Sequence, residues 1–195
     1  MKKTTRSPFA VTMHVITAAF ALLTGLFLLL YLRLRNGWLL DTTVTFGTTF
    51  YHFAMRLLVG ALVPNTLSCS ARWFRQHSWE PAVYQKLKVK SWKKHLPTYD
   101  PDSFSLELHT PQEVLSNMCQ AEVVHEVIAL LSFLPLLAVP FLGALPVFLI
   151  TSILSAAADL IFAIAQRYNR PRILRLMQKR AVIQSQRSFN YERKD

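Results

Sequence analysis

The sequence predicts an all-α membrane protein with about four transmembrane helices, and two features of its composition support this prediction. First, 52% of the 195 residues are hydrophobic, and the mean hydropathy is positive at +0.25. Second, the formal net charge is +11, and the basic residues lie in blocks apart from the apolar ones. Nucleic-acid binders combine such a charge with a polar surface, so we expect no nucleic-acid partner. Separate apolar and basic blocks are typical of a small polytopic membrane protein, and we expect residues 1–195 to form a single membrane domain.

Four stretches are long enough to cross a bilayer, which takes about 20 apolar residues in a helix. They cover residues 9–32, 44–63, 121–141 and 142–165. The first is too long for a signal peptide and has no small-residue cleavage site after it, so we expect a retained anchor. Only a turn rich in proline and glycine separates the last two, which predicts a tight helical hairpin.

The basic residues predict the orientation of these spans. Three Lys or Arg residues precede the first span, seven lie in residues 64–120 and nine follow residue 165, whereas the last hairpin turn has none. Basic segments stay in the cytoplasm. We therefore expect a multi-pass protein of the cell membrane with both termini, the 64–120 segment and the 166–195 tail in the cytoplasm.

The segment between the second and third spans changes character along its length. Its first half mixes tryptophans with lysines, which is typical of an interfacial helix on an anionic leaflet; RNA binding is the alternative interpretation. Its second half is acidic and is predicted to be a loop. Thr110, Pro111 and Glu113 then have the spacing of a helix start, with Thr110 as the N-cap, and the helix should run into the third span.

Ionisable residues inside a membrane span are costly and are therefore functional candidates. The chain has seven of them: His14, His52, Arg56, Glu122, His125, Glu126 and Asp159. With the orientation above, nearly all fall at one depth, about 8–10 Å from the cytoplasmic end at 1.5 Å per residue. His52 lies deeper but shares a helix face with Arg56. The pattern predicts a buried site that opens to the cytoplasm.

The densest group is Glu122-x-x-His125-Glu126, whose three side chains share one helical face. A carboxylate beside an imidazole orients it as a general base for an alcohol, so Glu122, His125 and Glu126 are the candidate catalytic residues. Two alternatives remain. Glu122 could pair with Arg56 or Arg167 between helices. Glu-x-x-His is also half of a di-iron site, but the chain has no second such motif, and we expect no metal.

The stretch 166–172 follows the last span directly and carries three arginines. Arg167, Arg170 and Arg172 can grip lipid phosphate or the phosphates of a soluble donor such as coenzyme A. The alternative is a plain cytoplasmic stop signal. Asp159, just before this stretch, either forms a salt bridge with Arg56 or takes a direct part in catalysis.

The two cysteines, Cys69 and Cys119, have no paired Cys/His spacing, so neither a disulfide framework nor a zinc site is expected. Cys119 lies one helical turn before Glu122. An acyl-cysteine intermediate is therefore a minor alternative to direct transfer.

Three motifs resemble those of the glycosyl-4,4'-diaponeurosporenoate acyltransferase family, small bacterial membrane proteins assigned to staphyloxanthin-type carotenoid synthesis. They are Trp92-Lys93-Lys94-x-Leu96-Pro97, Ala121-Glu122-x-x-His125 and Gln166-Arg167-Tyr168-Asn169-Arg170-Pro171-Arg172. The resemblance covers roughly residues 72–180. It implies that a fatty acyl group moves from a cytoplasmic thioester to a sugar hydroxyl of a glycolipid in a bacterial cell membrane. The implied partners are acyl-CoA or an acyl carrier, the glycolipid acceptor and membrane lipids, with no tightly bound cofactor.

Two other function classes are compatible with the same residues. Small membrane methyltransferases and reductases bind a soluble nucleotide cofactor at an arginine-rich cytoplasmic mouth. A lipid-binding or scaffold protein would use Glu122 and His125 for packing alone.

Overall fold

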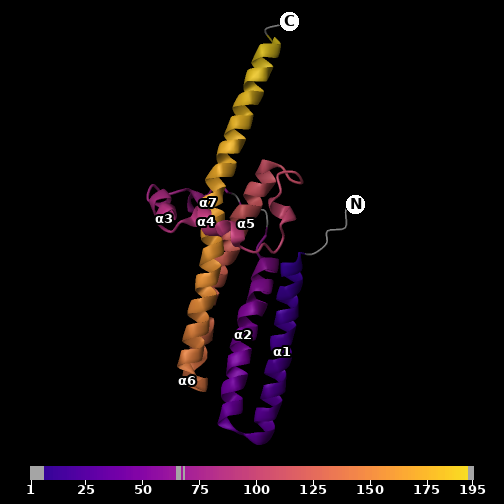
Figure 1. Ribbon diagram of the computed structural model, residues 1–195, viewed down its shortest axis with the longest axis vertical. Helices are drawn as coiled ribbons and strands as arrows, with labels where there is room; N and C mark the ends of the chain where they lie inside the picture. Colours follow the sequence, from indigo (N-terminus) through magenta and orange to yellow (C-terminus); the bar gives the residue numbers. More distant parts are fainter. Residues whose placement is uncertain (1–6, 65–66, 68, 193–195) are drawn as a thin grey trace.

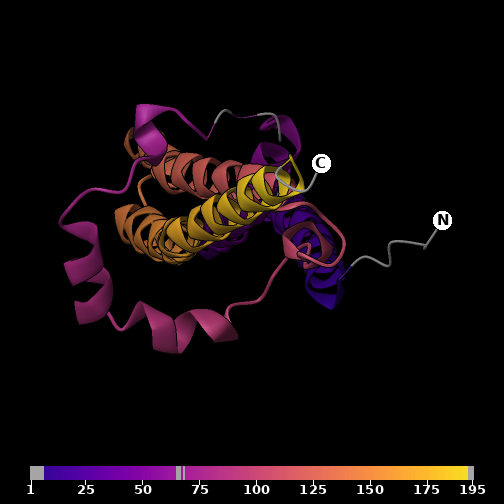
Figure 2. The same ribbon diagram turned by 90° about the horizontal axis from the view of Figure 1, so that it is seen from above.

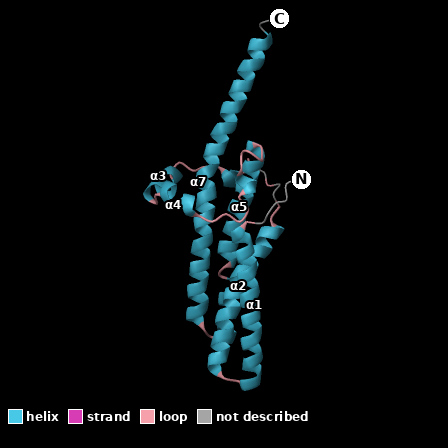
Figure 3. Cartoon of the chain, turned by 45° about the vertical axis from the view of Figure 1, so that its right-hand side comes forward, coloured by secondary structure: helices cyan, strands magenta, loops and turns pink. Residues whose placement is uncertain are grey.

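The computed structural model describes residues 7–64, 67 and 69–192, and within these ranges every regular element is an α-helix or a 3₁₀ helix. Two helical hairpins stand side by side, joined by residues 63–110 (Figure 1). Both hairpin turns lie at one end of the bundle, which we call the turn end. The start of α1, the described part of residues 63–110 and the second half of α7 lie at the opposite end, the segment end (Figure 3).

The first hairpin pairs α1 (Pro8–Leu34) with α2 (Gly37–Leu62). Ser7 caps α1, because its hydroxyl accepts a hydrogen bond from the N–H of Ala10 at 3.1 Å. The turn is short: Arg35 has a left-handed backbone with φ 51°, and Asn36 caps α2 through the N–H of Trp38 at 3.2 Å. Two closely spaced caps thus force α2 to run back along α1.

The second hairpin runs from α5 (Pro111–Leu131) to α7 (Leu145–Glu192). The predicted helix start is confirmed, since Thr110 and Glu113 form a reciprocal capping box and α5 continues into the apolar stretch. Prolines then disrupt regular α-helix, giving a 3₁₀ helix, η4 (Leu134–Ala138), and a single turn, α6 (Val139–Leu142). Gly143, with φ 65°, turns the chain into α7 and confirms the predicted hairpin.

Three helical stretches are long and apolar enough to cross a membrane: Pro8–Leu34, Pro111–Leu142 and Leu145–Gln186. Side chains on these stretches face outward, as Leu22 (76% exposed) and Phe141 (85% exposed) illustrate. An apolar exterior of this kind is stable only in lipid, so the protein is a membrane protein. The predicted second span lies in α2, which carries five threonines and is not among the three; the count of four spans stays a prediction.

Helix α7 is longer than the sequence analysis expected. It has 48 residues and passes through Pro171 without a break. Its second half extends well beyond the rest of the molecule (Figure 1).

The joining segment is made of short pieces rather than the single interfacial helix that its composition predicted. They are η1 (Arg72–Phe74), α3 (Glu80–Lys86), α4 (Val89–Trp92), η2 (Lys93–His95) and η3 (Asp102–Phe104). Seen from the segment end, the chain curves around α7 and α5 before it enters α5 (Figure 2). This path brings residues of the segment against both long helices.

The expectation of no disulfide is wrong. Cys69 and Cys119 are bonded, with their Cα atoms 6.0 Å apart, and the bond ties the chain after α2 to α5. Fifty positions separate the two cysteines, and only the path of the segment around the bundle brings them together.

Candidate active site

Two clusters of polar side chains lie between α5 and α7. One is built around Asp159 and the other around Glu122. On α5, His125 of the first cluster and Glu122 of the second are one turn apart, and the Glu122 cluster lies nearer the segment end. We describe the Asp159 cluster first.

His125 and Asp159 form a close pair across the two helices. The Nδ1 atom of His125 lies 2.9 Å from Oδ1 of Asp159, and the imidazole stacks on Phe162 with ring centroids 4.9 Å apart. The carboxylate is buried, with 3% of its side chain exposed, whereas the imidazole is 24% exposed. A buried carboxylate therefore fixes the ring, and the ring itself stays within reach of a substrate.

Arg56 of α2 holds the other oxygen of the same carboxylate in an ion pair. Its guanidinium also donates to the carbonyl of His52 at 2.6 Å and to the hydroxyl of Ser155 at 2.8 Å. Asp159 is thereby clamped between a cation and the imidazole. With the Nδ1–H of His125 donating to Asp159, Nε2 carries the free lone pair, which is the tautomer that a general base needs.

This arrangement changes the expected partner of His125. It forms no hydrogen bond or ion pair with Glu122 or Glu126; Glu126 instead accepts a hydrogen bond from Nε1 of Trp73 at 2.8 Å. The predicted salt bridge between Asp159 and Arg56 is confirmed. The sequence predicted Asp159 at the same depth in the membrane as His125, and this shared depth is the signal from which the pair could have been predicted.

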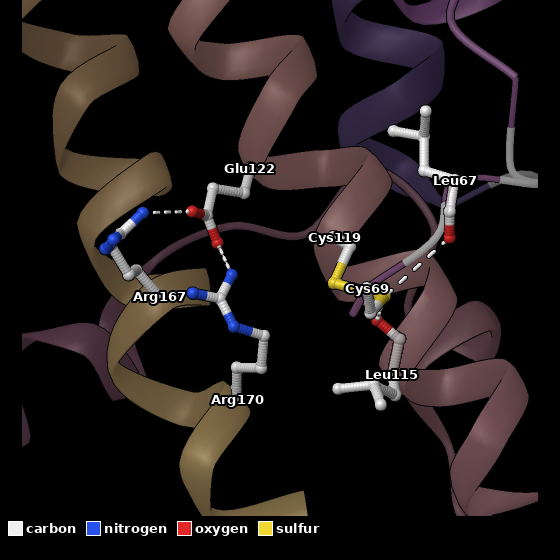
Figure 4. The surroundings of a disulfide bond; sticks show 7 residues. All are labelled: Leu67, Cys69, Leu115, Cys119, Glu122, Arg167 and Arg170. Carbon is white, nitrogen blue, oxygen red and sulfur yellow. Dashed lines mark hydrogen bonds and ion pairs between the residues drawn. A yellow bond between two sulfur atoms is a disulfide. The ribbon is translucent and has the colours of Figure 1, made fainter. Parts of the chain in front are cut away.

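Glu122 is fully buried and lies between two arginines of α7 (Figure 4). Oε1 is 2.7 Å from Nη1 of Arg167, and Oε2 is paired with Nη1 of Arg170. The alternative that Glu122 pairs with Arg167 between helices is thus confirmed. Arg170 is 2% exposed, and its guanidinium lies 5.2 Å from the ring centre of Phe74.

Arg167 spends all five of its N–H donors on the protein. Besides Glu122, it donates Nε–H and Nη2–H to Oε1 of Glu80 at 3.0 and 2.9 Å. It also donates to the carbonyls of Trp73 and Arg75, each at 3.1 Å. A guanidinium has five donors and no more, so Arg167 has none left for a phosphate.

Glu80 was missed by the sequence analysis, although it is the single acidic residue in residues 64–99. It is 1% exposed, and Tyr84 donates to its Oε2 at 2.7 Å. Burial raises the pKa of Glu80, but the hydrogen bonds from Arg167, from the N–H of His77 and from Tyr84 outweigh it, so the pKa is lowered overall. Burial, followed by the bond to Glu80, raises the pKa of Tyr84. Two carboxylates and two guanidiniums make this cluster neutral.

Asn169 and Arg172 face a different surface of α7. Nζ of Lys93 donates to Oδ1 of Asn169 and lies 4.5 Å from the ring centre of Tyr168. Burial, with the positive charge of Arg172 nearby, lowers the pKa of Lys93. Arg172 itself is exposed. This surface presents two cations close together.

The remaining candidates lie outside both clusters. His14 is exposed and contacts the hydroxyl of Tyr99 at 3.1 Å, so it belongs to neither cluster. His52 is 5% exposed, and neither ring nitrogen has a partner among the described residues. Cys119 is fully buried and bonded to Cys69, which removes it as a nucleophile in this state. Within the described ranges, no three His, Cys, Asp or Glu residues are grouped as metal ligands.

The sequence model of one family, glycosyl-4,4'-diaponeurosporenoate acyltransferase, matches residues 70–179. The chain belongs to this family. The matched stretch contains His125, Asp159 and the whole Glu122 cluster, but not Arg56. No curated protein and no solved structure matches the chain. Both clusters between α5 and α7 are therefore set mainly by the part of the chain that the family shares.

Proposed function

We propose that the protein is an integral-membrane O-acyltransferase in which His125, oriented by Asp159, is the general base. The observation that carries this proposal is the 2.9 Å contact between Nδ1 of His125 and Asp159. It stands in a chain whose family is named for acyl transfer to a glycosylated lipid acid. A clamped carboxylate, a fixed tautomer and a partly exposed imidazole are what proton removal from a hydroxyl requires.

The proposed step needs no covalent enzyme intermediate. Nε2 of His125 takes the proton of a sugar hydroxyl on the glycolipid as its oxygen attacks the carbonyl carbon of the acyl thioester. The carbon–sulfur bond breaks, and the departing thiolate takes the proton back from His125. The products are the acylated sugar and the free thiol. Asp159 stabilises the imidazolium formed between the two transfers.

The donor is proposed to be acyl-CoA or an acyl carrier on the cytoplasmic side. Arg167 and Arg170 match the family's arginine motif, but their donors face buried carboxylates. We propose that they hold the segment between α2 and α5 against α7 and α5. Lys93 and Arg172, with Asn169, are the better candidates for the donor phosphates, because Arg172 is exposed and Lys93, which contacts Asn169, lies near it.

We further propose four spans, with α2 crossing beside α1. The two helices have 26 and 27 residues and pair along their length, so a bilayer that contains α1 also contains α2. Nineteen of the 22 Lys and Arg residues lie in the N-terminal tail, in residues 64–120 or after residue 165. The positive-inside rule then puts the segment end in the cytoplasm of a bacterial cell.

Cytoplasmic orientation predicts that the Cys69–Cys119 bond seen in the structure is reduced to two thiols in the cell, because the cytosol keeps such pairs reduced. The orientation is tested in a chain with Cys69 and Cys119 changed to Ser and Gln76, an exposed residue, changed to Cys, by labelling intact cells with membrane-permeant and impermeant maleimides. Modification by the permeant reagent alone supports the orientation, and modification by the impermeant reagent contradicts it.

The function itself is tested with purified protein in lipid, radiolabelled acyl-CoA and a glycolipid extract. Wild-type protein should release thiol and label a lipid. His125→Ala should reduce the rate about 10²- to 10⁴-fold, the usual contribution of a general base. His14→Ala, which changes an exposed histidine on α1, is the matched control and should keep wild-type activity. Absence of thiol release from folded protein, across chain lengths and acceptors, would overturn the proposal.

A further inference from the structure

Beyond Pro171, helix α7 carries basic side chains along one face. Arg172, Arg175 and Lys179 follow one another at spacings of three and four residues, which places them on the same side of a helix; we call them the basic row. All three are exposed, and none forms an ion pair with the described residues. Residues 160–191 contain no Asp or Glu, so the helix itself supplies no counter-charge. The row therefore presents uncompensated positive charge to the solvent.

The basic row faces away from the rest of the molecule. On a different side of α7, Ile173 and Met177 pack against the core cluster that contains Phe74. Farther along the helix, Val182 and Ile183 lie on the same side as the row and are 55% and 50% exposed. Cations next to exposed aliphatic side chains are typical of a surface that binds another protein.

The outer part of the row lies too far from the membrane to be bound by lipid charges. The predicted fourth span ends at residue 165, and Lys179 follows on the same unbroken helix, about 21 Å farther at 1.5 Å per residue. The headgroup layer accounts for roughly 5–8 Å of that distance, and charges are screened over about 8 Å at physiological salt. Figure 1 shows this part of α7 projecting past the segment. An anion in the cytoplasm is therefore the better partner for the row.

At its base, the row adjoins the proposed phosphate site. Lys93 donates to Asn169, about one turn before Arg172 on α7. Because Arg167 and Arg170 are paired with buried carboxylates, Lys93 and Arg172 are the cations left there for a phosphate. Coenzyme A carries a pyrophosphate and a further phosphate on one nucleotide, which is more negative charge than two cations neutralise. The arm of an acyl carrier protein has a single phosphodiester, which two neighbouring cations match.

We propose that the basic row docks an acidic acyl carrier protein, whose arm brings the acyl thioester to the bundle past the phosphate site. The inference rests on the proposed acyl transfer and names its preferred donor. Acidic side chains of the carrier pair with Arg175 and Lys179, and the phosphodiester of its arm lies at Lys93 and Arg172. In the transfer, the carbon–sulfur bond to the arm breaks, and the thiolate of the arm takes the proton from His125.

Two other partners fit the surface less well. A second copy of this chain in the same membrane would bring each cation of the row against its own counterpart, and like charges in an interface oppose association. Coenzyme A reaches the phosphate site, but it is too small to contact Lys179 at the same time. We therefore expect acyl-CoA to serve as a donor without using the outer part of the row.

Adjacent cations of α7 provide a matched test. Lys179 lies in the row, whereas Arg180 is also exposed and points about 100° away around the helix. Each is changed to Glu, and the purified proteins are placed in nanodiscs of zwitterionic lipid, which removes anionic lipid as a partner. The Kd of a bacterial acyl carrier protein with a free arm thiol is measured. Transfer is then followed with the same acyl chain on the carrier and on coenzyme A.

We expect Lys179→Glu to raise the Kd of the carrier, and the KM for the acylated carrier, about tenfold or more, because a close charge pair becomes repulsive. Arg180→Glu should change both values by less than about threefold, as is usual for a charge outside the contact. The KM for acyl-CoA should differ from the wild-type value by less than about twofold in both variants, since coenzyme A binds at the base of the row.

The inference is overturned if Lys179→Glu binds the carrier as the wild type does, or if the two variants lose equally. It is also overturned if the KM for acyl-CoA rises as much as that for the acylated carrier. Wild-type protein that binds RNA, anionic vesicles or a second copy through Lys179, but not the carrier, contradicts it too. Carrier binding that depends on Lys179 without any transfer in wild type would sink the proposed catalysis and leave the docking surface standing.

Discussion

The two clusters between α5 and α7 contain similar side chains but have different roles. Around Glu122, two carboxylates and two guanidiniums satisfy one another, and Glu122 is fully buried. Around Asp159, a carboxylate is clamped by Arg56, but its second partner is an imidazole that is 24% exposed. A network of buried ion pairs between helices fixes the structure, whereas one that ends on an accessible ring can exchange a proton.

The largest expected effect is the loss of stability on substitution of Glu122. Glu122→Gln leaves the buried guanidinium of Arg170 without its counter-charge, and breaking one partner of a buried pair costs about 3–5 kcal/mol. We expect a large fall in the unfolding temperature in detergent. Glu126→Gln is the matched control on the same helix and should lose less than about 1 kcal/mol, because its carboxylate is only partly buried. Equal losses in both variants would contradict the scaffold role of the Glu122 cluster.

An intermediate effect is expected at Lys93, one of the two cations proposed to bind the donor phosphates. Lys93→Ala should raise KM for acyl-CoA about tenfold or more and leave kcat nearly unchanged, since a phosphate contact binds the donor without touching the reacting atoms. Lys86→Ala, on α3 of the same segment, is the control. A fall in kcat with KM unchanged would argue against a donor site on this surface.

The smallest effect concerns acid stability. Because the pKa of Glu80 is lower in the folded protein, its contribution to stability is present above the pKa of an unfolded glutamate, about 4.3. That contribution is lost as the pH falls through the lower folded value. Below about pH 4.3, the free energy of unfolding of Glu80→Gln should therefore fall by ~1 kcal/mol less than that of the wild type. An unchanged acid limb in thermal unfolding would show that Glu80 is not ionised in the network.

Local sequence signals predicted much of the fold. The capping box at Thr110 and Glu113 and the turn at Gly143 depend only on neighbouring residues, and both are confirmed. The continuation of α7 through Pro171 was not predictable in this way. A proline removes one backbone donor and normally bends or ends a helix. Here Arg167 and Arg170, in the helical turn just before Pro171, are held by ion pairs to α5, which keep the helix in place.

The sequence predicted which residues form the candidate site but not which of them pair. The sequence placed His125, Glu122 and Asp159 at one depth, and it gave His125 two carboxylates on its own helix. Which carboxylate it meets depends on the rotation of α5 against α7, which packing such as the 2.8 Å contact between Ser132 and Ser155 sets. The role of Glu80 and the Cys69–Cys119 bond likewise arise from the path of the segment around α7.

The central claim is that His125 acts as the general base, whereas the Glu122 cluster stabilises the fold. One paired measurement tests this claim most directly. The kcat of acyl transfer and the unfolding temperature are determined side by side for His125→Gln and Glu122→Gln, with kcat expressed per folded molecule. The account predicts that His125→Gln loses about 10²- to 10⁴-fold in kcat at an unchanged unfolding temperature. It predicts that Glu122→Gln unfolds at a lower temperature but keeps kcat within about tenfold. A His125→Gln variant that remains active, or a stable Glu122→Gln variant that is inactive, would contradict it.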